Sequence, residues 1–186
     1  MHVELDFSNV LDTNISAEHG LSYMQIEQLS ERGKSILEDL RQKSKNEKLG
    51  FYNLPYEKEI AEEIESYADA VRDRYEYYVH IGIGGSALGP IALHTSLLDS
   101  YYNMAHSPKM FFPDNVDPDW LDDLVKTINI SKTLFHIVSK SGGTAETAAT
   151  TLYFMKYLKE ALGDNFYKNL LFTTDPVKGL LNQIAR

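Results

Sequence analysis

The sequence predicts an α/β fold in which a parallel sheet is flanked by helices and preceded by a helical N-terminal segment. From residue 76 onward, apolar runs of strand length alternate with longer stretches of helical periodicity. The runs are apolar throughout, which is typical of parallel strands buried on both faces. The expected strands are 77–82, 109–113, 133–138 and 169–174, and the expected helices are 87–99, 118–128 and 145–162.

Two helix starts are well marked in this region. Asp117-Pro118 and Asp175-Pro176 each place an aspartate, which is a good N-cap, before a proline, which suits the first helical position. We expect an open sheet with right-handed crossovers, whose ligands lie beyond the carboxyl ends of the strands. Because the sequence ends within a helical pattern after the fourth strand, we expect the chain to be part of a larger protein.

The first 75 residues have a different character. Residues 1–21 are mixed in composition and are expected to form an extended N-terminal arm. A charged helical segment follows, in which Ser22 and Gln25 have the spacing of a capping box and residues 50–55 interrupt the helix. The expected domains are a helical arm, 1–75, and an α/β domain, 76–186.

Composition and charge restrict the class of protein. The chain has 27 acidic and 18 basic residues and a formal net charge of −9, whereas nucleic-acid-binding proteins normally have a basic face. The absence of cysteine excludes disulfides, thiolate catalysis and cysteine-ligated metals, and it fits the cytoplasm. The start lacks a signal-peptide pattern, and no apolar run approaches the ~20 residues that cross a bilayer. We expect a cytoplasmic protein without nucleic-acid or membrane partners.

Two junctions between a strand and the following helix carry most of the functional information. Their sequences are Gly82-Ile83-Gly84-Gly85-Ser86 and Ser139-Lys140-Ser141-Gly142-Gly143-Thr144. The start of a helix has unpaired N–H groups and a partial positive charge, which attract anions. Glycine lets the backbone approach a ligand, and Ser and Thr add hydroxyl donors. Because both loops are expected at one edge of the sheet, they predict a pocket for a phosphorylated small molecule.

Two other interpretations of these loops are open. Residues 82–87 satisfy the permissive G-x-G-x-x-A form of the dinucleotide fingerprint, which would indicate a nicotinamide- or flavin-dependent oxidoreductase. That fingerprint expects an acidic residue about 20 positions on, but Asp114 lies farther along and the second loop is left unexplained. A turn that needs glycine only for packing does not explain two loops rich in hydroxyl groups. We therefore favour the phosphate site.

Other polar residues in this region have simpler interpretations. With Gly143 as the N-cap, Glu146 occupies the third helical position, so we interpret it as a capping carboxylate rather than a base. Lys140 is expected to pair with a phosphate as a point charge. His80 and His136 fall within strands and are expected to be hydrogen-bonded core residues. The six histidines have no metal-ligand spacing, so no metal site is predicted.

Three stretches resemble signatures of the glucose-6-phosphate isomerase family. They are residues 79–90, 112–118 and 139–147, and their order and spacing agree with the family over residues 76–175. The resemblance implies the sugar isomerase (SIS) fold, a parallel sheet wrapped by helices. The substrate-binding residues that it implies are Gly85 and Ser86 for the sugar, and Ser139, Lys140, Ser141 and Thr144 for the phosphate. Gly143 and Ala87 depart from the pattern, since members often carry threonine and a polar or bulky residue there.

The resemblance also implies an activity. Family members interconvert glucose 6-phosphate and fructose 6-phosphate in glycolysis and gluconeogenesis, without a metal or an organic cofactor. They open the sugar ring and transfer a proton between C2 and C1 through a cis-enediol. Because their catalytic base lies in a later segment, we expect it beyond Arg186, and we expect this N-terminal portion to be inactive alone and the full-length protein to be a homodimer. The alternative is a non-catalytic SIS module that binds or senses a phosphosugar.

Overall fold

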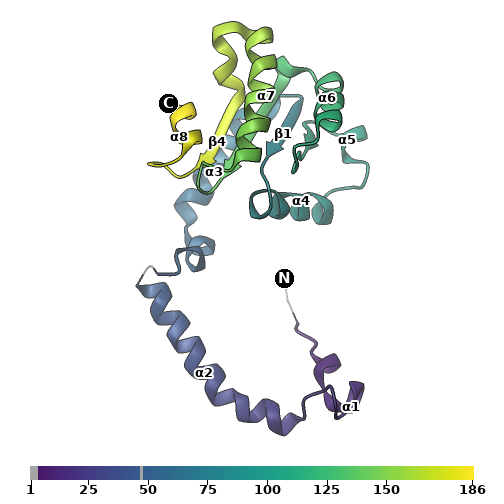
Figure 1. The fold of residues 1–186 in the computed structure, drawn as a ribbon, viewed down its shortest axis with the longest axis vertical. Coiled ribbons are helices and arrows are strands. Elements are labelled where there is room, and N and C mark those ends of the chain that lie inside the picture. The colour runs from purple at the N-terminus through teal and green to yellow at the C-terminus, as the bar shows by residue number, and fades with distance from the viewer. Residues whose placement is uncertain (1–3, 47) are drawn as a thin grey trace. The chain divides into compact units, whose positions relative to one another are not determined.

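The computed structural model describes residues 4–46 and 48–186. The chain forms two compact units, Met1–Ile64 and Glu65–Arg186, which are described separately (Figure 1). None of the helices in these described residues has the length and apolar character that crossing a membrane would require. The division into domains at residue 75 stays a prediction.

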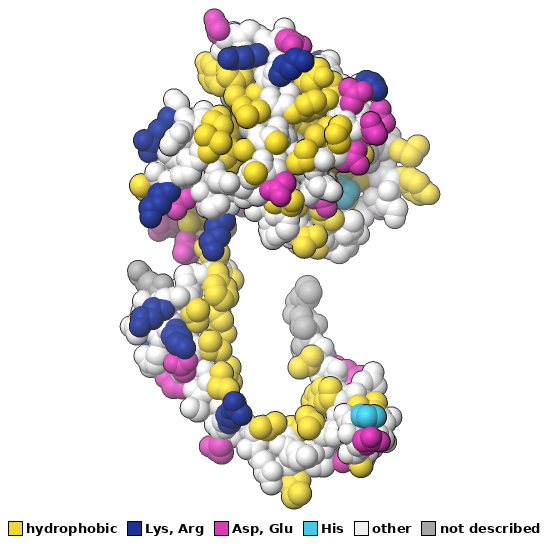
Figure 2. Space-filling model, viewed as in Figure 1, with side chains coloured by type: hydrophobic (Ala, Val, Ile, Leu, Met, Phe, Trp, Pro, Cys, Tyr) yellow, Lys and Arg dark blue, Asp and Glu magenta, His cyan; other side chains and the backbone are white. Residues whose placement is uncertain are grey.

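The first unit is helical. Its long helix α2 spans Tyr23–Lys45, and short 3-10 turns at Gly50–Tyr52 and Leu54–Tyr56 follow. The next helix, α3, Lys58–Val71, begins in this unit and ends in the second. The predicted capping box is confirmed, because Ser22 Oγ accepts from the Gln25 N–H at 3.3 Å and Gln25 Oε1 accepts from the Ser22 N–H at 2.8 Å. Figure 2 shows hydrophobic side chains in a row along α2, none of whose residues is buried.

The prediction of an extended arm before α2 is wrong for the residues that the structure describes there. A 3-10 turn at Ser8–Val10 leads into α1, Asp12–Ile15, and the chain then doubles back. The Leu21 N–H donates to the Val10 carbonyl at 2.9 Å, and the Asp12 N–H donates to the Leu21 carbonyl at 3.0 Å. Leu11, which lies between these backbone bonds, is buried.

The second unit contains the predicted parallel sheet. Its strands are β1, Tyr77–Ile81; β2, Lys109–Phe111; β3, Thr133–Ser139; and β4, Leu170–Thr174. The strand order is β2-β1-β3-β4, and every pairing is parallel. The chain leaves β1 toward β2 on one side and returns with β3 on the other. A topological switch point therefore lies between β1 and β3, the place where open α/β sheets bind their ligands.

Helices follow the strands in the predicted order, and a short helix before β2 is additional (Figure 1). They are α4, Gly85–Leu97; α5, Tyr102–Ala105; α6, Pro118–Thr127; α7, Ala145–Leu162; and α8, Leu180–Ala185. Further 3-10 turns span Arg72–Arg74, Ile130–Lys132 and Gly163–Asn169. The predicted cap of α6 is confirmed, since Asp117 Oδ1 accepts from the Trp120 N–H at 3.1 Å.

The corresponding prediction at Asp175-Pro176 is wrong. The next helix begins only at Leu180. Asp175 Oδ1 instead accepts from the N–H groups of Val177 and Lys178, at 2.8 and 2.9 Å, and these two bonds lower the pKa of its carboxyl. An aspartate can close such a turn as readily as it can cap a helix, so local sequence does not distinguish the two.

The two faces of the sheet differ in polarity. On one face Val79, Ile81, Phe135 and Ile137 are at most 1% exposed and pack against side chains of α6 and α7. The other face carries a smaller apolar cluster that includes Leu134, followed along the strands by polar residues. The prediction of apolar strands buried on both faces is therefore confirmed for the first face and only in part for the second, which is apolar around Leu134 and polar beyond it.

Removing a core side chain from α7 tests this arrangement. Phe154→Ala should lower the free energy of unfolding by about 3–5 kcal/mol, because Phe154 is 1% exposed and its ring centroid lies 4.9 Å from that of Phe135. Leu152→Ala on the same helix is the matched control, since Leu152 is 55% exposed, and should cost less than about 0.5 kcal/mol. Urea unfolding followed by circular dichroism measures both, and equal effects would contradict this core.

Candidate functional site

Both predicted loops lie at the switch point of the sheet. One follows β1 and the other follows β3, and these strands are hydrogen-bonded neighbours with Ile81 opposite Ile137. Each loop opens a helix of more than ten residues, α4 after the first and α7 after the second. The sequence prediction that the loops share one edge of the sheet is therefore confirmed.

The first loop depends on glycine at its start. A Cβ atom on Gly82 would lie 2.6 Å from the carbonyl oxygen of Ser86, so no larger residue fits without moving the loop. The same carbonyl accepts a hydrogen bond from His80 Nε2 at 2.7 Å. The start of α4 is thus held against the end of β1 from two sides, which places Gly85 and Ser86 at the opening of the helix.

The second loop is organised by the hydroxyl of a buried serine. Ser139 is 1% exposed, and its Oγ accepts from the Gly142 N–H at 3.2 Å and lies 3.1 Å from Thr144 Oγ1. Ser141 is exposed, and its Oγ accepts from the Gly143 N–H at 3.2 Å. The hydroxyl of Ser139 therefore shapes the loop from within, whereas Lys140 and Ser141 face solvent.

The residues after β3 are also held by β4 and by the segment that follows it. Thr174 Oγ1 donates to the Ser139 carbonyl at 2.7 Å, and the Leu181 N–H donates to the Gly142 carbonyl at 3.0 Å. Gly142 has φ +65°, and a Cβ there would lie 2.9 Å from Thr174 Oγ1. Both the conformation and the close approach require glycine, so the loop is ordered by its contacts.

The predicted cap of α7 is wrong by one residue. Thr144, not Gly143, is the N-cap: its backbone is extended (φ −68°, ψ 119°), and the Ala148 N–H donates to its carbonyl at 3.0 Å. Glu146 consequently occupies the second helical position and has no capping bond, so the capping-box interpretation of Glu146 fails. The Thr144 hydroxyl lies 3.1 Å from Ser139 Oγ at the end of β3, a contact within the loop that the capping-box pattern does not include.

A cleft of about 570 Å³ lies beside the loops on the polar face of the sheet. This volume is within the usual range for small-molecule sites. Its lining residues are His80, Gly85, Ser86, Pro90, His136, Val138, Lys140, Thr173, Thr174 and Asp175. Three of the six predicted binding residues, Gly85, Ser86 and Lys140, thus share one cleft. The others, Ser139, Ser141 and Thr144, surround the start of α7 without lining it.

The cleft floor contains a hydrogen-bonded cluster that sequence reasoning treated only as core. His80 and His136 are register partners on β1 and β3, with ring centroids 5.2 Å apart. Tyr78 Oη lies 2.6 Å from His136 Nδ1, and His136 Nε2 lies 2.8 Å from Thr173 Oγ1. The prediction that both histidines are hydrogen-bonded is confirmed. The sequence contained a feature that could have indicated this cluster, because each histidine interrupts an apolar strand just before a glycine-rich loop.

Burial keeps this cluster neutral. It lowers the pKa of His80, and together with the nearby His80 it lowers the pKa of His136 to about 4. Burial also raises the pKa of the Tyr78 hydroxyl well above its ordinary value. Charged forms of these groups would lose hydration that the apolar surroundings do not replace.

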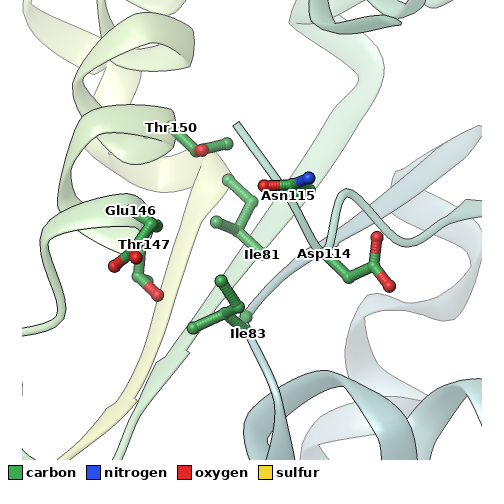
Figure 3. Close-up of a pocket in the computed structure, with 8 residues that line it drawn as sticks. Ile81, Ile83, Asp114, Asn115, Glu146, Thr147 and Thr150 are labelled. Carbon is green, nitrogen blue, oxygen red and sulfur yellow. The ribbon is translucent and has the colours of Figure 1, made fainter. Parts of the chain in front are cut away.

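A second, much smaller cavity of about 10 Å³ lies near the start of α7 (Figure 3). Glu146, Thr147 and Thr150 line it from α7, Ile81 and Ile83 from the end of β1 and its loop, and Asp114 and Asn115 from the loop after β2. It shares no lining residue with the cleft. In the described residues, no three His, Cys, Asp or Glu side chains gather to form a metal site.

Together, the fold and the loops define a class of protein: an open parallel α/β domain with two glycine-rich loops at its switch point. The sequence profile of the Phosphoglucose isomerase family matches residues 56–174. The chain belongs to this family. The resemblance found in the three sequence signatures is thereby confirmed.

Individual relatives agree with this assignment. A glucose-6-phosphate isomerase of Carboxydothermus hydrogenoformans is 42% identical over 100% of this chain and 41% of its own length, and one of Rubrobacter xylanophilus is 38% identical over 98% and 42%. The chain therefore spans about two fifths of the length of these curated relatives.

Solved structures show the same fold. A crystal structure of a hypothetical protein from Thermus thermophilus has a TM-score of 0.72 and 38% identity, and the match covers 86% of this chain and 38% of that one. A glucose-6-phosphate isomerase from Chlamydia trachomatis has a TM-score of 0.57 and 30% identity over 65% of this chain and 23% of its own.

The neutrality of the histidine cluster is testable by NMR. In the folded protein, His136 should stay neutral until the pH falls to about 4, whereas in urea it should protonate near the ordinary value of about 6.5. Between these values the unfolded chain binds more protons, so this group destabilises the folded state as the pH falls through the window. Protonation of His136 near pH 6.5 in the folded protein would contradict the buried environment described above.

Proposed function

We propose that this chain binds the phosphate and part of the sugar of glucose 6-phosphate, as the N-terminal portion of an enzyme that interconverts glucose 6-phosphate and fructose 6-phosphate. The observation that carries the proposal is the placement of both loops beside one cleft at the switch point, in a chain of the phosphoglucose isomerase family. The proposal extends to a cytoplasmic, homodimeric full-length protein, as the family resemblance implies.

Each loop has a distinct part in this proposal. The phosphate lies at the start of α7, where free N–H groups, the Ser141 and Thr144 hydroxyls and the Lys140 ammonium favour an anion. Gly85 and Ser86 contact the sugar from the start of α4. Because the second loop is already ordered by Ser139 and Thr174, little conformational entropy is lost when the phosphate binds. The binding energy then orients the sugar carbons for reaction.

We place the base that moves the proton between C2 and C1 outside these 186 residues. Such a base must reach the proton that it removes. Glu146 lines the small cavity of Figure 3, which shares no residue with the cleft. His80 is 2% exposed and donates from Nε2 to the Ser86 carbonyl, so neither its position nor its proton suits this task. Although Glu146 is not a capping carboxylate, its place in this separate cavity argues against it as the base.

Removal of two hydroxyls tests the phosphate site. Ser141→Ala combined with Thr144→Ala should weaken glucose 6-phosphate binding by about 1–3 kcal/mol, because charge-assisted hydrogen bonds are lost. Ser131→Ala is the matched control, since Ser131 is exposed and lies before β3, at the opposite end of that strand from the loop. Calorimetry measures all three proteins, and unchanged affinity in the double variant would remove these hydroxyls from the site.

The position of the base gives a separate prediction. The 186-residue chain should bind glucose 6-phosphate but show no isomerase activity above the uncatalysed rate in a coupled assay. Glu146→Gln should therefore leave both binding and the absence of turnover unchanged. Measurable turnover that Glu146→Gln abolishes would show that the base lies within the chain and that it is Glu146.

A further inference from the structure

Three polar side chains form a continuous row across the sheet from β1 to the cleft. Tyr78 on β1 contacts His136 on β3, and His136 contacts Thr173 on β4, with distances of 2.6 and 2.8 Å. Thr173 is exposed at the cleft that also contains Ser86 and Lys140. Because hydroxyl and imidazole groups can both donate and accept, the direction of these hydrogen bonds decides what Thr173 offers to a ligand.

The hydrogen position on the neighbouring His80 is fixed by its own hydrogen bond. The carbonyl oxygen of Ser86 can only accept, so the bond at 2.7 Å requires a hydrogen on His80 Nε2. Since burial favours the neutral ring, the Nδ1 atom of His80 has no hydrogen. The Tyr78 hydroxyl therefore has two possible acceptors, His80 Nδ1 at 3.4 Å and His136 Nδ1 at 2.6 Å.

The distances from the Tyr78 hydroxyl to the two histidines indicate that Tyr78 donates its hydrogen to His136. A bond of 2.6 Å suits an O–H donor, whereas N–H donors prefer about 2.9–3.0 Å, and 3.4 Å is long for either. If Tyr78 donates to His136 Nδ1, neutral His136 carries its hydrogen on Nε2 and donates it to Thr173 Oγ1. The hydroxyl hydrogen of Thr173 is then free to point into the cleft. The reverse direction would require the long bond to His80 and would turn the Thr173 hydrogen away from the cleft.

We propose that Tyr78 and His136 are positioning residues that hold the Thr173 hydroxyl as a hydrogen-bond donor to a sugar oxygen, a hydroxyl or ring oxygen, in the cleft. This inference rests on the proposed function. Thr173 is the register partner of Val138, the residue immediately before the phosphate loop. Because Thr173 and Lys140 of that loop line the same cleft, we place the sugar oxygens next to the phosphate at this position. The phosphate itself does not contact Thr173.

The tautomer of His136 tests the direction of the row without any ligand. Nitrogen-15 NMR of the histidine rings at neutral pH should show the hydrogen on Nε2 of both His80 and His136. Tyr78→Phe removes the donor to Nδ1 and should shift His136 toward the Nδ1–H form, while His80 keeps its hydrogen on Nε2. Tyr77→Phe on the same strand is the control and should leave both tautomers unchanged. An Nδ1–H tautomer of His136 in the unaltered protein would overturn the proposal.

Ligand binding tests the role of Thr173. Thr173→Val, which is nearly isosteric, should weaken glucose 6-phosphate binding about five- to tenfold, as expected for one hydrogen bond, and Thr173→Ser should restore it. Tyr78→Phe should weaken binding in the same direction, and Tyr77→Phe should not. Inorganic phosphate, which lacks the sugar, should bind all these variants as it binds the unaltered chain.

The outcomes separate this inference from the proposed function. If glucose 6-phosphate binds normally to Thr173→Val, the inference is overturned and the phosphate site stands. If Thr173→Val also weakens inorganic phosphate, Thr173 acts through the loop and the sugar contact is wrong. If neither ligand binds the unaltered chain, the proposed function fails and the sugar contact fails with it.

Discussion

Direct pairing between β1 and β3 is the constraint on which the rest of the structure depends. Because β2 lies on the far side of β1, the loops after β1 and β3 open at adjacent positions of one edge. The same register places Val79 beside Phe135 on the core face and His80 beside His136 on the other. A change that separated these two strands would disrupt the loops, the core and the polar cluster together.

The two faces of this strand pair stabilise the domain in different ways. One face excludes water with large apolar side chains, and Phe154 and Leu158 of α7 complete it. The other face contains two histidines and a tyrosine, which are tolerated because they are neutral and hydrogen-bonded. Networks of this kind specify one arrangement of the strands, since a shifted register would leave buried polar groups without partners.

The loop after β3 is held in place by hydrogen bonds from the rest of the fold, which supports the proposed binding of phosphate there. The Ser139 hydroxyl and carbonyl, Thr174 on β4 and the backbone of Leu181 all contribute hydrogen bonds that hold the loop. Residues after β4 therefore support a site that is built mainly from the end of β3. Such preorganisation lets phosphate contacts contribute to affinity instead of offsetting the cost of ordering the chain.

The sequence by itself determined the features that depend on neighbouring residues. The strand and helix order, the capping box at Ser22 and the cap at Asp117 were predictable, because each depends on periodicity or on a contact three residues away. The position of the two loops at one edge followed from the parallel sheet, and the family followed from the loop sequences.

Only the tertiary structure decided the N-cap of α7, the turn at Asp175 and the lining of the cleft. Thr144 is placed by a contact with Ser139, and Thr173 reaches the cleft only because β4 pairs with β3. The lining of the cleft depends on contacts between strands whose residues lie 37 and 58 positions apart in the chain. The bonds at Thr144 and Asp175 are short in sequence, but several such bonds are open to these residues. Local sequence contains the donors and acceptors, but the fold selects which of them meet.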